Sequence, residues 1–233
     1  MSARLEGMVV VVTGGGSGIG LAAAKAFAAE GANVAICGRD KAALDAAAKE
    51  TGAFARACDV TDPAAVARFV ADVMGEFGRI DVLINNAGAL GPIGPLADAT
   101  PEDWEATLKA NATGPFLTTR AVLKAAEPSC VIGISSGQGR KGSAGWGPYA
   151  ASKHALEGMI SVWADEYKGK TRFFSLSPGP VATRMRALAA PKEDPKSIKT
   201  PKAVAAALVA VVLDEKLESG TLLRLDPKGK LEC

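Results

Sequence analysis

Two side chains in the second half of the chain could exchange protons with a substrate. Tyr149 and Lys153 stand four residues apart, and Pro148 before them suits the first turn of a helix. Residues at this spacing lie on one helix face, one turn apart. A free phenol, with a pKa of about 10, exchanges protons poorly at neutral pH, but a nearby ammonium lowers that pKa. The pair therefore predicts a tyrosine that acts as acid or base, although taken alone it also fits an exposed lysine beside a packed tyrosine.

A glycine-rich turn near the start of the chain could bind a phosphate group. The run Thr13-Gly14-Gly15-Gly16-Ser17-Gly18-Ile19-Gly20 follows an apolar stretch and precedes a helical pattern. Gly14 and Gly18 allow a tight turn that approaches a pyrophosphate, and Gly20 lets the helix pack close to the strand. The N–H groups of the helix N-terminus would face the anion. The order of strand, turn and helix favours a dinucleotide site over a flexible loop.

The residues after the second expected strand indicate which dinucleotide binds. The strand Ala32–Cys37 is followed by Gly38, Arg39 and Asp40. An acidic side chain here accepts hydrogen bonds from the ribose of NAD, whereas an arginine suits the 2′-phosphate of NADP. We therefore predict NADP(H) over NAD(H). The alternative is that Arg39 is a solvated loop residue, and Asp40 is expected to cap the next helix in either case.

Short apolar runs alternate with helical patterns along the whole chain. This alternation predicts a parallel sheet covered on both faces, a Rossmann-type doubly wound α/β fold with about seven strands and about six helices. Residues 1–233 are read as a single domain that binds the dinucleotide and performs catalysis. Thr100-Pro101 and Thr200-Pro201 are expected to begin helices, and Gly52 and Gly78 to end them. The expected strands are Met8–Val12, Ala32–Cys37, Ala53–Cys58, Ile80–Asn85, Cys130–Ser135, Thr171–Leu176 and Thr221–Leu225.

Composition and charge exclude several other classes of protein. The 27 basic and 25 acidic residues nearly balance, so a nucleic-acid partner is not expected. The longest apolar run, Ala203–Leu213, is shorter than the roughly 18 residues that a membrane span needs. The run after Met8 has no cleavage site of a signal peptide, and we expect a cytoplasmic protein. Four dispersed cysteines and one histidine give no metal site.

Taken together, these motifs resemble the short-chain dehydrogenase/reductase family. The glycine turn has that family's T-G-x-x-x-G-x-G spacing, and the other matches follow in order over nearly the whole chain. They are Asn85-Asn86-Ala87-Gly88, Asn111, Ser135-Ser136, Tyr149-Ala150-Ala151-Ser152-Lys153, Pro178-Gly179 and Thr183. The resemblance implies an oxidoreductase that transfers a hydride between NADP(H) and a carbonyl or alcohol substrate.

The resemblance also implies catalytic roles. Tyr149 would donate the proton to the carbonyl oxygen, and Lys153 would hold the nicotinamide ribose and lower the pKa of Tyr149. Ser136 would hydrogen-bond the same oxygen, with Ser135 as the competing assignment because adjacent strand residues point oppositely. Asn111 would position a water that relays protons to Lys153; alternatively it only bends its helix.

The same resemblance implies a set of cofactor contacts. Asp59 and Val60 would surround the adenine, Asn86 would lie beside the adenosine ribose, and Val181 and Thr183 would meet the nicotinamide amide. Asp59 could instead be an ordinary residue at a strand end. The full predicted cofactor set is Thr13, Gly14, Ser17, Gly18, Ile19, Gly20, Arg39, Asp59, Val60, Asn86, Ala87, Gly88, Tyr149, Lys153, Val181 and Thr183.

Two segments depart from the family pattern and leave the substrate open. Arg184–Lys199, the candidate substrate lid, is short, and its basic residues could attract an anionic substrate or simply be solvated. Trp146 could line the substrate pocket or pack a loop. The tail Leu225–Lys230 lacks the paired glycines that many relatives have around the last strand, a region of subunit contacts. The family nevertheless suggests a homodimer or homotetramer.

Two other functions compete with a dehydrogenase. The run Gly133–Gly137 fits the G-x-S-x-G pattern of hydrolases, but neither a following helix nor a suitably placed histidine base is expected, since His154 directly follows Lys153. A catalytically weak sensor or scaffold that binds NADP(H) would have the same fold. Because Ser136, Tyr149 and Lys153 are all present, we favour an enzyme.

Overall fold

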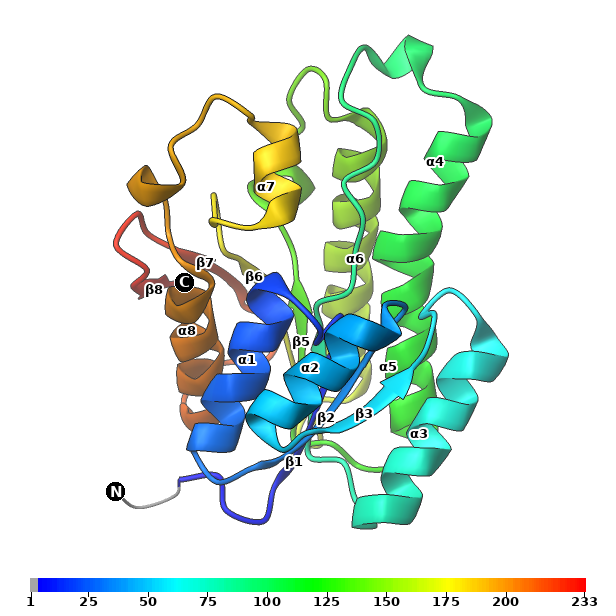
Figure 1. Cartoon of the computed structure of the whole chain (residues 1–233), viewed down its shortest axis with the longest axis vertical. Helices are drawn as coiled ribbons and strands as arrows, with labels where there is room; N and C mark the ends of the chain where they lie inside the picture. Colours follow the sequence, from blue (N-terminus) through cyan, green and yellow to red (C-terminus); the bar gives the residue numbers. More distant parts are fainter. Residues whose placement is uncertain (1–3) are drawn as a thin grey trace.

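The strands form one sheet whose order reverses beside the first strand. The computed structural model describes residues 4–233, and its strand order is β3-β2-β1-β4-β5-β6-β7-β8 (Figure 1). All neighbours pair in parallel except β7 and β8, which are antiparallel. The strands are β1 (Val9–Thr13), β2 (Asn33–Gly38), β3 (Phe54–Ala57), β4 (Val82–Asn85), β5 (Cys130–Ile134), β6 (Arg172–Ser177), β7 (Leu222–Leu225) and β8 (Leu231–Glu232).

The helices begin and end where capping residues stand. Thr100 and Thr200 accept hydrogen bonds from the backbone N–H groups of Asp103 and Ala203, and Gly52 and Gly78 end their helices with positive φ. These four predictions are confirmed. The helices are α1 (Gly18–Ala29), α2 (Lys41–Thr51), α3 (Pro63–Phe77), α4 (Pro101–Leu108), α5 (Gly114–Ala125), α6 (Gly147–Glu166), α7 (Arg184–Ala189) and α8 (Pro201–Leu213).

Two hydrophobic layers enclose the sheet, because strands buried on both faces send alternate side chains to opposite sides. In β1, Val10 and Val12 pack in the layer with α1, α2 and α8. Val9 and Val11 pack in the opposite layer with α3, α5 and α6. The doubly wound α/β fold predicted from the alternation is therefore confirmed. Within residues 4–233, no helix is long and apolar enough to cross a membrane.

Two local features were not predicted. The long helix expected after Pro101 is divided by a π-helical turn, η2 (Lys109–Thr113), which separates α4 from α5. The strand β8 returns antiparallel to β7 through a turn in which the N–H of Asp226 donates to the carbonyl of Lys230. A strand of two residues carries too little periodicity to be found from sequence.

The topology brings the predicted site residues to one edge of the sheet. Since β1 neighbours both β2 and β4, the strand order switches at the carboxyl ends of β1 and β4. In open α/β sheets ligands bind at such a switch point. The glycine turn follows β1, the Asn86–Gly88 segment follows β4, and Ser136 and Thr183 follow β5 and β6.

Candidate active site

The turn between β1 and α1 leaves room only for glycine. Gly14 and Gly18 have φ of 67° and 54°, a region that side chains rarely adopt. A Cβ on Gly14 would lie 2.9 Å from the amide nitrogen of Asn86, and a Cβ on Gly20 would lie 2.2 Å from the carbonyl oxygen of Gly14. Ser17 precedes α1, and its side chain makes no capping hydrogen bond within residues 4–233. The N-terminus of α1 thus presents backbone N–H groups beside a turn whose glycines carry no side chains.

Thr13 and Asn86 hold this turn against β4. The Thr13 hydroxyl accepts hydrogen bonds from the backbone N–H groups of Asn86 and Ala87, both at 3.0 Å. The side-chain amide of Asn86 donates to the carbonyls of Thr13 at 2.9 Å and Gly14 at 3.2 Å. The side chain of Asn86, predicted to lie beside a ribose, therefore braces the glycine turn. Thr13 likewise shapes the site through its buried hydroxyl.

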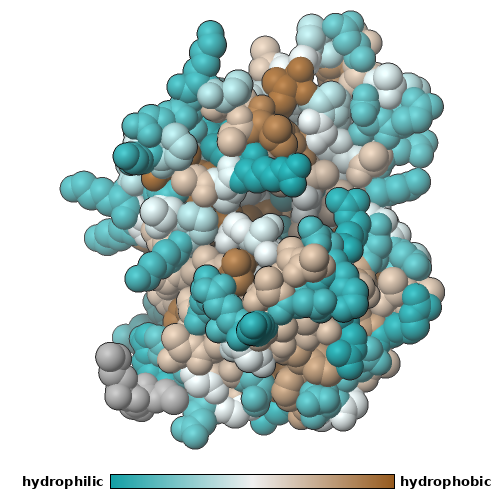
Figure 2. Space-filling view, viewed as in Figure 1, coloured by the Kyte–Doolittle hydropathy of each residue, from teal (hydrophilic) through white to brown (hydrophobic). Residues whose placement is uncertain are grey.

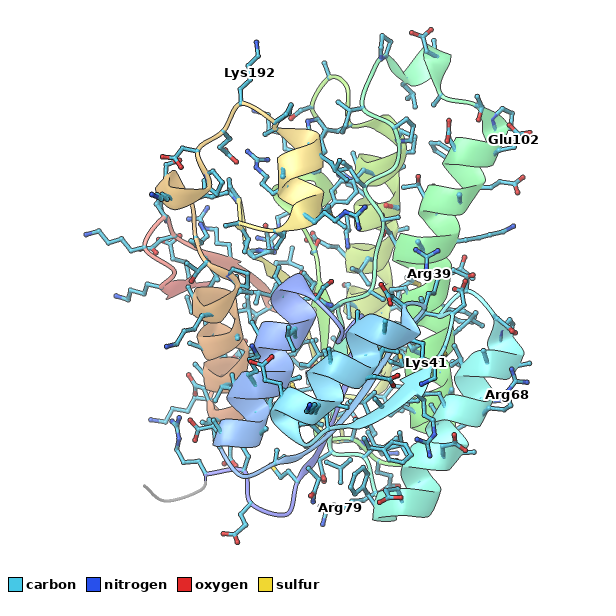
Figure 3. All side chains as sticks on the ribbon, viewed as in Figure 1. Arg39, Lys41, Arg68, Arg79, Glu102 and Lys192 are labelled. Atoms are coloured by element: carbon cyan, nitrogen blue, oxygen red, sulfur yellow. The ribbon has the colours of Figure 1, made fainter. Side chains whose placement is uncertain are left out.

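The end of β2 carries the cation that was expected to select the dinucleotide. Arg39 is exposed next to the start of α2, as Figure 3 shows, and no ion pair within residues 4–233 involves it. Asp40 caps α2 as predicted, accepting from the N–H of Ala43 at 3.0 Å. The carboxylate of Asp59 accepts from the N–H of Thr61 at 2.9 Å and its hydroxyl at 2.8 Å. These bonds, and to a smaller extent the charge of Arg39, lower the pKa of Asp59.

The other expected adenine residue is largely part of the core. Val60 is 8% exposed, and a Cβ added to Gly114 would meet its side chain at 2.8 Å. Val60 thus packs against the start of α5. The local bonds of Asp59 agree with the alternative that Asp59 is an ordinary residue at a strand end.

Tyr149 and Lys153 lie one turn apart on α6, as predicted. Both are buried, with the Lys153 ammonium nitrogen 5.7 Å from the centre of the Tyr149 ring. That ammonium donates to the carbonyl of Ile134 at 2.7 Å, which ties α6 to the end of β5. Burial lowers the pKa of Lys153 to about 8, and the charge of Glu157 opposes this shift.

The pKa of Tyr149 is raised in this structure. Burial is the largest cause, and the neighbouring Ser136 side chain opposes the rise without overcoming it. The net shift is therefore opposite to the expected direction, while the lowering effect expected from the charge of Lys153 stays a prediction.

The two adjacent serines have different partners. The Ser135 hydroxyl is buried and donates to the Glu157 carboxylate at 2.6 Å. Ser136 is half-buried, accepts from the N–H of Gln138 at 3.2 Å and is the serine that lowers the pKa of Tyr149. The bond of Ser135 to Glu157 favours the assignment to Ser136 over the competing assignment to Ser135. A short 3₁₀ turn, η3 (Gly137–Gly139), follows instead of a helix, and His154 bonds the carbonyl of Ala150 at 2.9 Å, so the parts of a hydrolase are not assembled.

Asn111 lies in the π-helical turn and joins three segments. Its side chain accepts from the N–H of Ala89 at 2.7 Å and donates to the Ala89 carbonyl at 2.8 Å and the Ser152 hydroxyl at 3.0 Å. A Cβ on Gly88 would lie 2.7 Å from the Asn111 oxygen and 3.8 Å from the Lys153 nitrogen. Asn111 therefore occupies an interruption of its helix, and Gly88 lies between it and Lys153; the expected relay through a water stays a prediction.

The segment after β6 meets the glycine turn. Val181 is buried, and Thr183 caps α7 by accepting from the N–H of Arg186 at 3.3 Å. The methyl group of Thr183 would contact a Cβ on Gly18 at 3.4 Å. Residues from the first and sixth strands thus border one space, as the motif order predicted.

Arg140 and Glu157 are two polar residues beside Ser135 that the sequence did not indicate. They form an ion pair of 3.2 Å, and Glu157 accepts from Ser135. Glu157 stands four residues after Lys153, which puts it on the same helix face, and that spacing was the available signal. No sequence signal indicated Arg140, because it lies in an irregular loop.

The glycine turn and the Tyr149–Lys153 pair occupy the same sheet edge, and this combination is typical of a dinucleotide-dependent oxidoreductase of the Rossmann type. Residues 8–194 match the family model described as short chain dehydrogenase. The chain belongs to the short-chain dehydrogenase family of oxidoreductases.

Several proteins of known sequence or structure are similar to this chain over most of both chains. An Escherichia coli protein named as an uncharacterized oxidoreductase, YciK, is 36% identical over 84% of this chain and 82% of its own. A Shigella flexneri short chain dehydrogenase solved in complex with NADP has a TM-score of 0.88 and 31% identity, covering 96% of this chain and 99% of its own. An Escherichia coli homologue solved in complex with NADPH has the same TM-score, identity and coverage.

Proposed function

We propose that this protein transfers a hydride between NADP(H) and a carbonyl or alcohol, with Tyr149 as the proton donor in reduction and the acceptor in oxidation. The observation that carries the proposal is the position of the Tyr149 hydroxyl. It lies beside Ser136, whose side chain lowers the Tyr149 pKa, and one helical turn from Lys153, at the sheet edge that also holds the glycine turn. A protein that only bound the dinucleotide would have no need of this proton donor.

The residues present fit a dinucleotide. The cradle at Gly14, Gly18 and Gly20 has no space for a Cβ at two of its three positions, so a pyrophosphate bound there would meet bare backbone. Thr183 borders the same turn, and Arg39 stands where a 2′-phosphate would be held. When bound, the dinucleotide supplies or accepts the hydride. The NADP and NADPH complexes of the two structural relatives support the choice of this cofactor.

The chain's own groups supply the proton chemistry. Because burial raises the pKa of Tyr149, its phenol stays protonated at neutral pH and is ready to donate to a carbonyl oxygen. Ser136 would donate a hydrogen bond to the same oxygen and stabilise its developing charge. The Lys153 ammonium, held by the Ile134 carbonyl, stabilises the tyrosinate that forms when the proton leaves.

The surroundings of Tyr149 favour an apolar carbonyl compound. The ring centres of Trp146 and Tyr149 are 5.7 Å apart, and the half-exposed side chains of Ile93 and Leu96 pack beside the segment that leads into α6. Hydrophobic surface is also visible in the upper part of Figure 2.

The basic residues of the candidate lid differ in their placement. Arg186 is paired with Glu193 through two bonds of 2.6 Å, and Lys192 points away from the molecule in Figure 3. A Cβ on Gly179 would lie 3.3 Å from the Lys199 nitrogen. Arg186 and Lys192 therefore give little support to the alternative of an anionic substrate.

A helix surface suggests self-association. Phe116 on α5 and Val162 on α6 are 41% and 56% exposed, and Phe116 stacks on Trp163 at 6.4 Å. Large side chains exposed side by side on two helices are typical of an interface. We therefore keep a homo-oligomer as part of the proposal.

NADPH oxidation by the purified protein tests the proposed function. A panel of ketones, aldehydes, quinones and β-ketoacyl thioesters would be compared with the variant Tyr149→Phe. We expect carbonyl-dependent turnover that falls by about a hundredfold or more in Tyr149→Phe, with the NADPH affinity nearly unchanged. NADPH binding without turnover on any carbonyl would favour the sensor, and equal loss of turnover and affinity would assign Tyr149 a structural role.

A further inference from the structure

Three consecutive residues at the end of β5 each face one residue of α6. Ser136 lies beside Tyr149 and lowers its pKa, the Ile134 carbonyl accepts from Lys153, and Ser135 donates to Glu157. On the helix, the three partners are spaced four residues apart and therefore lie on one face. Tyr149 and Lys153 belong to the proposed chemistry, whereas Glu157 has no place in it so far.

Glu157 is the centre of a buried polar network. Its carboxylate is 8% exposed and accepts from Ser135 at 2.6 Å, Arg140 at 3.2 Å and Ser175 at 3.4 Å. Arg140 also donates to the carbonyl of Leu223 at 2.9 Å. The network thus joins α6 to the end of β5, to β6, to β7 and to the loop after Ser136.

That loop lies directly on the turn of α6 that carries Lys153. A Cβ on Gly139 would lie 2.9 Å from the Ser135 hydroxyl and 3.0 Å from the Lys153 carbonyl oxygen. The loop therefore packs backbone against backbone, and Arg140, its next residue, is fixed by the ion pair with Glu157. A shift of this pair would move Ser136 relative to Tyr149.

We propose that Glu157 and Arg140 are positioning residues for proton transfer, which hold the Ser136 loop and the Tyr149–Lys153 face of α6 in one fixed arrangement. This inference rests on the proposed function, because it assigns the pair to the geometry of that same proton transfer. The pair touches neither the substrate carbonyl nor the dinucleotide cradle. Its effect is therefore expected on turnover and on the pH dependence, with binding left intact.

The charge of Glu157 gives the pair a second, measurable effect. The titratable groups on α6 around the Lys153 ammonium are Tyr149 and Glu157. The neighbouring groups on β5 and η2, the Ile134 carbonyl and the Asn111 side chain, are uncharged. Arg140 lies in the loop after Ser136 and pairs with Glu157. Glu157 raises the pKa of Lys153, so its replacement by glutamine would lower that pKa further. Lys153 would then lose its proton at a lower pH.

The test compares Glu157→Gln, Arg140→Gln and the double variant with the unaltered protein, using NADPH and phenanthrenequinone, a planar diketone. Glutamine keeps the size of Glu157 and an oxygen that can accept from Ser135. We expect each single variant to lower kcat by about tenfold or more while the Kd for NADPH changes by less than about twofold. The kcat of the double variant should be about equal to that of the less active single variant, because the two residues act as a unit.

Two further readouts separate positioning from general stability. In Glu157→Gln, reductive kcat/KM should begin to fall at lower pH, a shift that a merely structural role would not produce. The matched control is Glu166→Gln, at the exposed end of the same helix, which should behave like the unaltered protein. If Glu157→Gln does not fold by circular dichroism, Arg140→Gln decides by the same kcat and Kd criteria, since its side chain is 25% exposed.

An unaltered kcat and pH profile in Glu157→Gln would overturn the inference. Tyr149→Phe, measured in parallel, separates this failure from failure of the proposed function. If Tyr149→Phe is inactive while Glu157→Gln is normal, only the positioning role is wrong. If Tyr149→Phe keeps its turnover, the proton-transfer scheme itself is wrong, and the positioning role is rejected with it.

Discussion

Lys153 and Tyr149 illustrate how burial sets protonation at the scale of single residues. Removal from water disfavours the charged form of each group, so the pKa of Lys153 falls to about 8 and the pKa of Tyr149 rises. Near neutral pH the lysine is a cation and the phenol is neutral. This is the pair of states that reduction of a carbonyl requires.

The lowered pKa of Lys153 predicts the direction of the pH dependence. Lys153 is protonated below about pH 8 and loses its cation above that value. Because the cation stabilises the forming tyrosinate, kcat/KM for NADPH-dependent reduction should fall as the pH rises through about 8. A pH series in overlapping buffers checks this. Reduction that stays constant up to pH 10 would show that the charge of Lys153 is not needed.

Arg39 predicts the choice between NADPH and NADH. In Arg39→Ala, the KM for NADPH should rise by about tenfold to a hundredfold, the value of a lost charge-assisted bond, and the KM for NADH should change little. Steady-state kinetics with both cofactors measure the ratio. The control is Arg68→Ala, an exposed arginine on the nearby helix α3 (Figure 3), which should leave the ratio unchanged. A full NADPH preference in Arg39→Ala would remove the assignment.

The sequence allowed the chemical roles of residues to be predicted better than the contacts between their side chains. The spacing of Tyr149 and Lys153 was sufficient to place them on one helix face. Which of Ser135 and Ser136 faces Tyr149 could not be decided, because that depends on how β5 meets η3. The partnership of Arg140 with Glu157 was also beyond sequence reasoning, since it is set by tertiary packing.

At the scale of elements, the glycine turn and α3 offer a matched pair of substitutions. Gly20→Ala would press a methyl group into the Gly14 carbonyl and should strongly weaken NADPH binding. Gly75→Ala lies inside α3 with no atom within 4 Å of the new methyl group, and it should stabilise the protein by about 0.5–1 kcal/mol. Fluorescence titration with NADPH and thermal melting measure the two effects. Unchanged NADPH affinity in Gly20→Ala would contradict the cradle.

Elements were predictable where sequence patterns are long or capped. The seven parallel strands and the helix starts at Pro101 and Pro201 were found within one or two residues. The π-helical turn at Asn111 was not found, because its sequence remains compatible with a regular helix. Its cause is tertiary: the Asn111 side chain is bonded to Ala89 and Ser152.

At the scale of the whole molecule, the exposed face of α5 and α6 predicts self-association. The double variant Phe116→Glu/Val162→Glu should have a smaller mass in solution than the unaltered protein, because two charges would be desolvated at the interface. Light scattering during size-exclusion chromatography measures the mass. Leu188→Glu, on an exposed position of α7, is the control. A monomeric unaltered protein would contradict the proposed oligomer.

The proposed contact residues all precede Arg184, yet the chain after that point is tied to them. The helix α8 packs against α1, the helix whose first turn borders the glycine cradle. The C-terminal region therefore supports the glycine cradle through α1, although it contributes no residue to the proposed cofactor contacts. Proteolytic removal of α8 should abolish NADPH binding without removing any proposed contact residue, so a variant that loses affinity does not by itself identify a residue that touches NADPH.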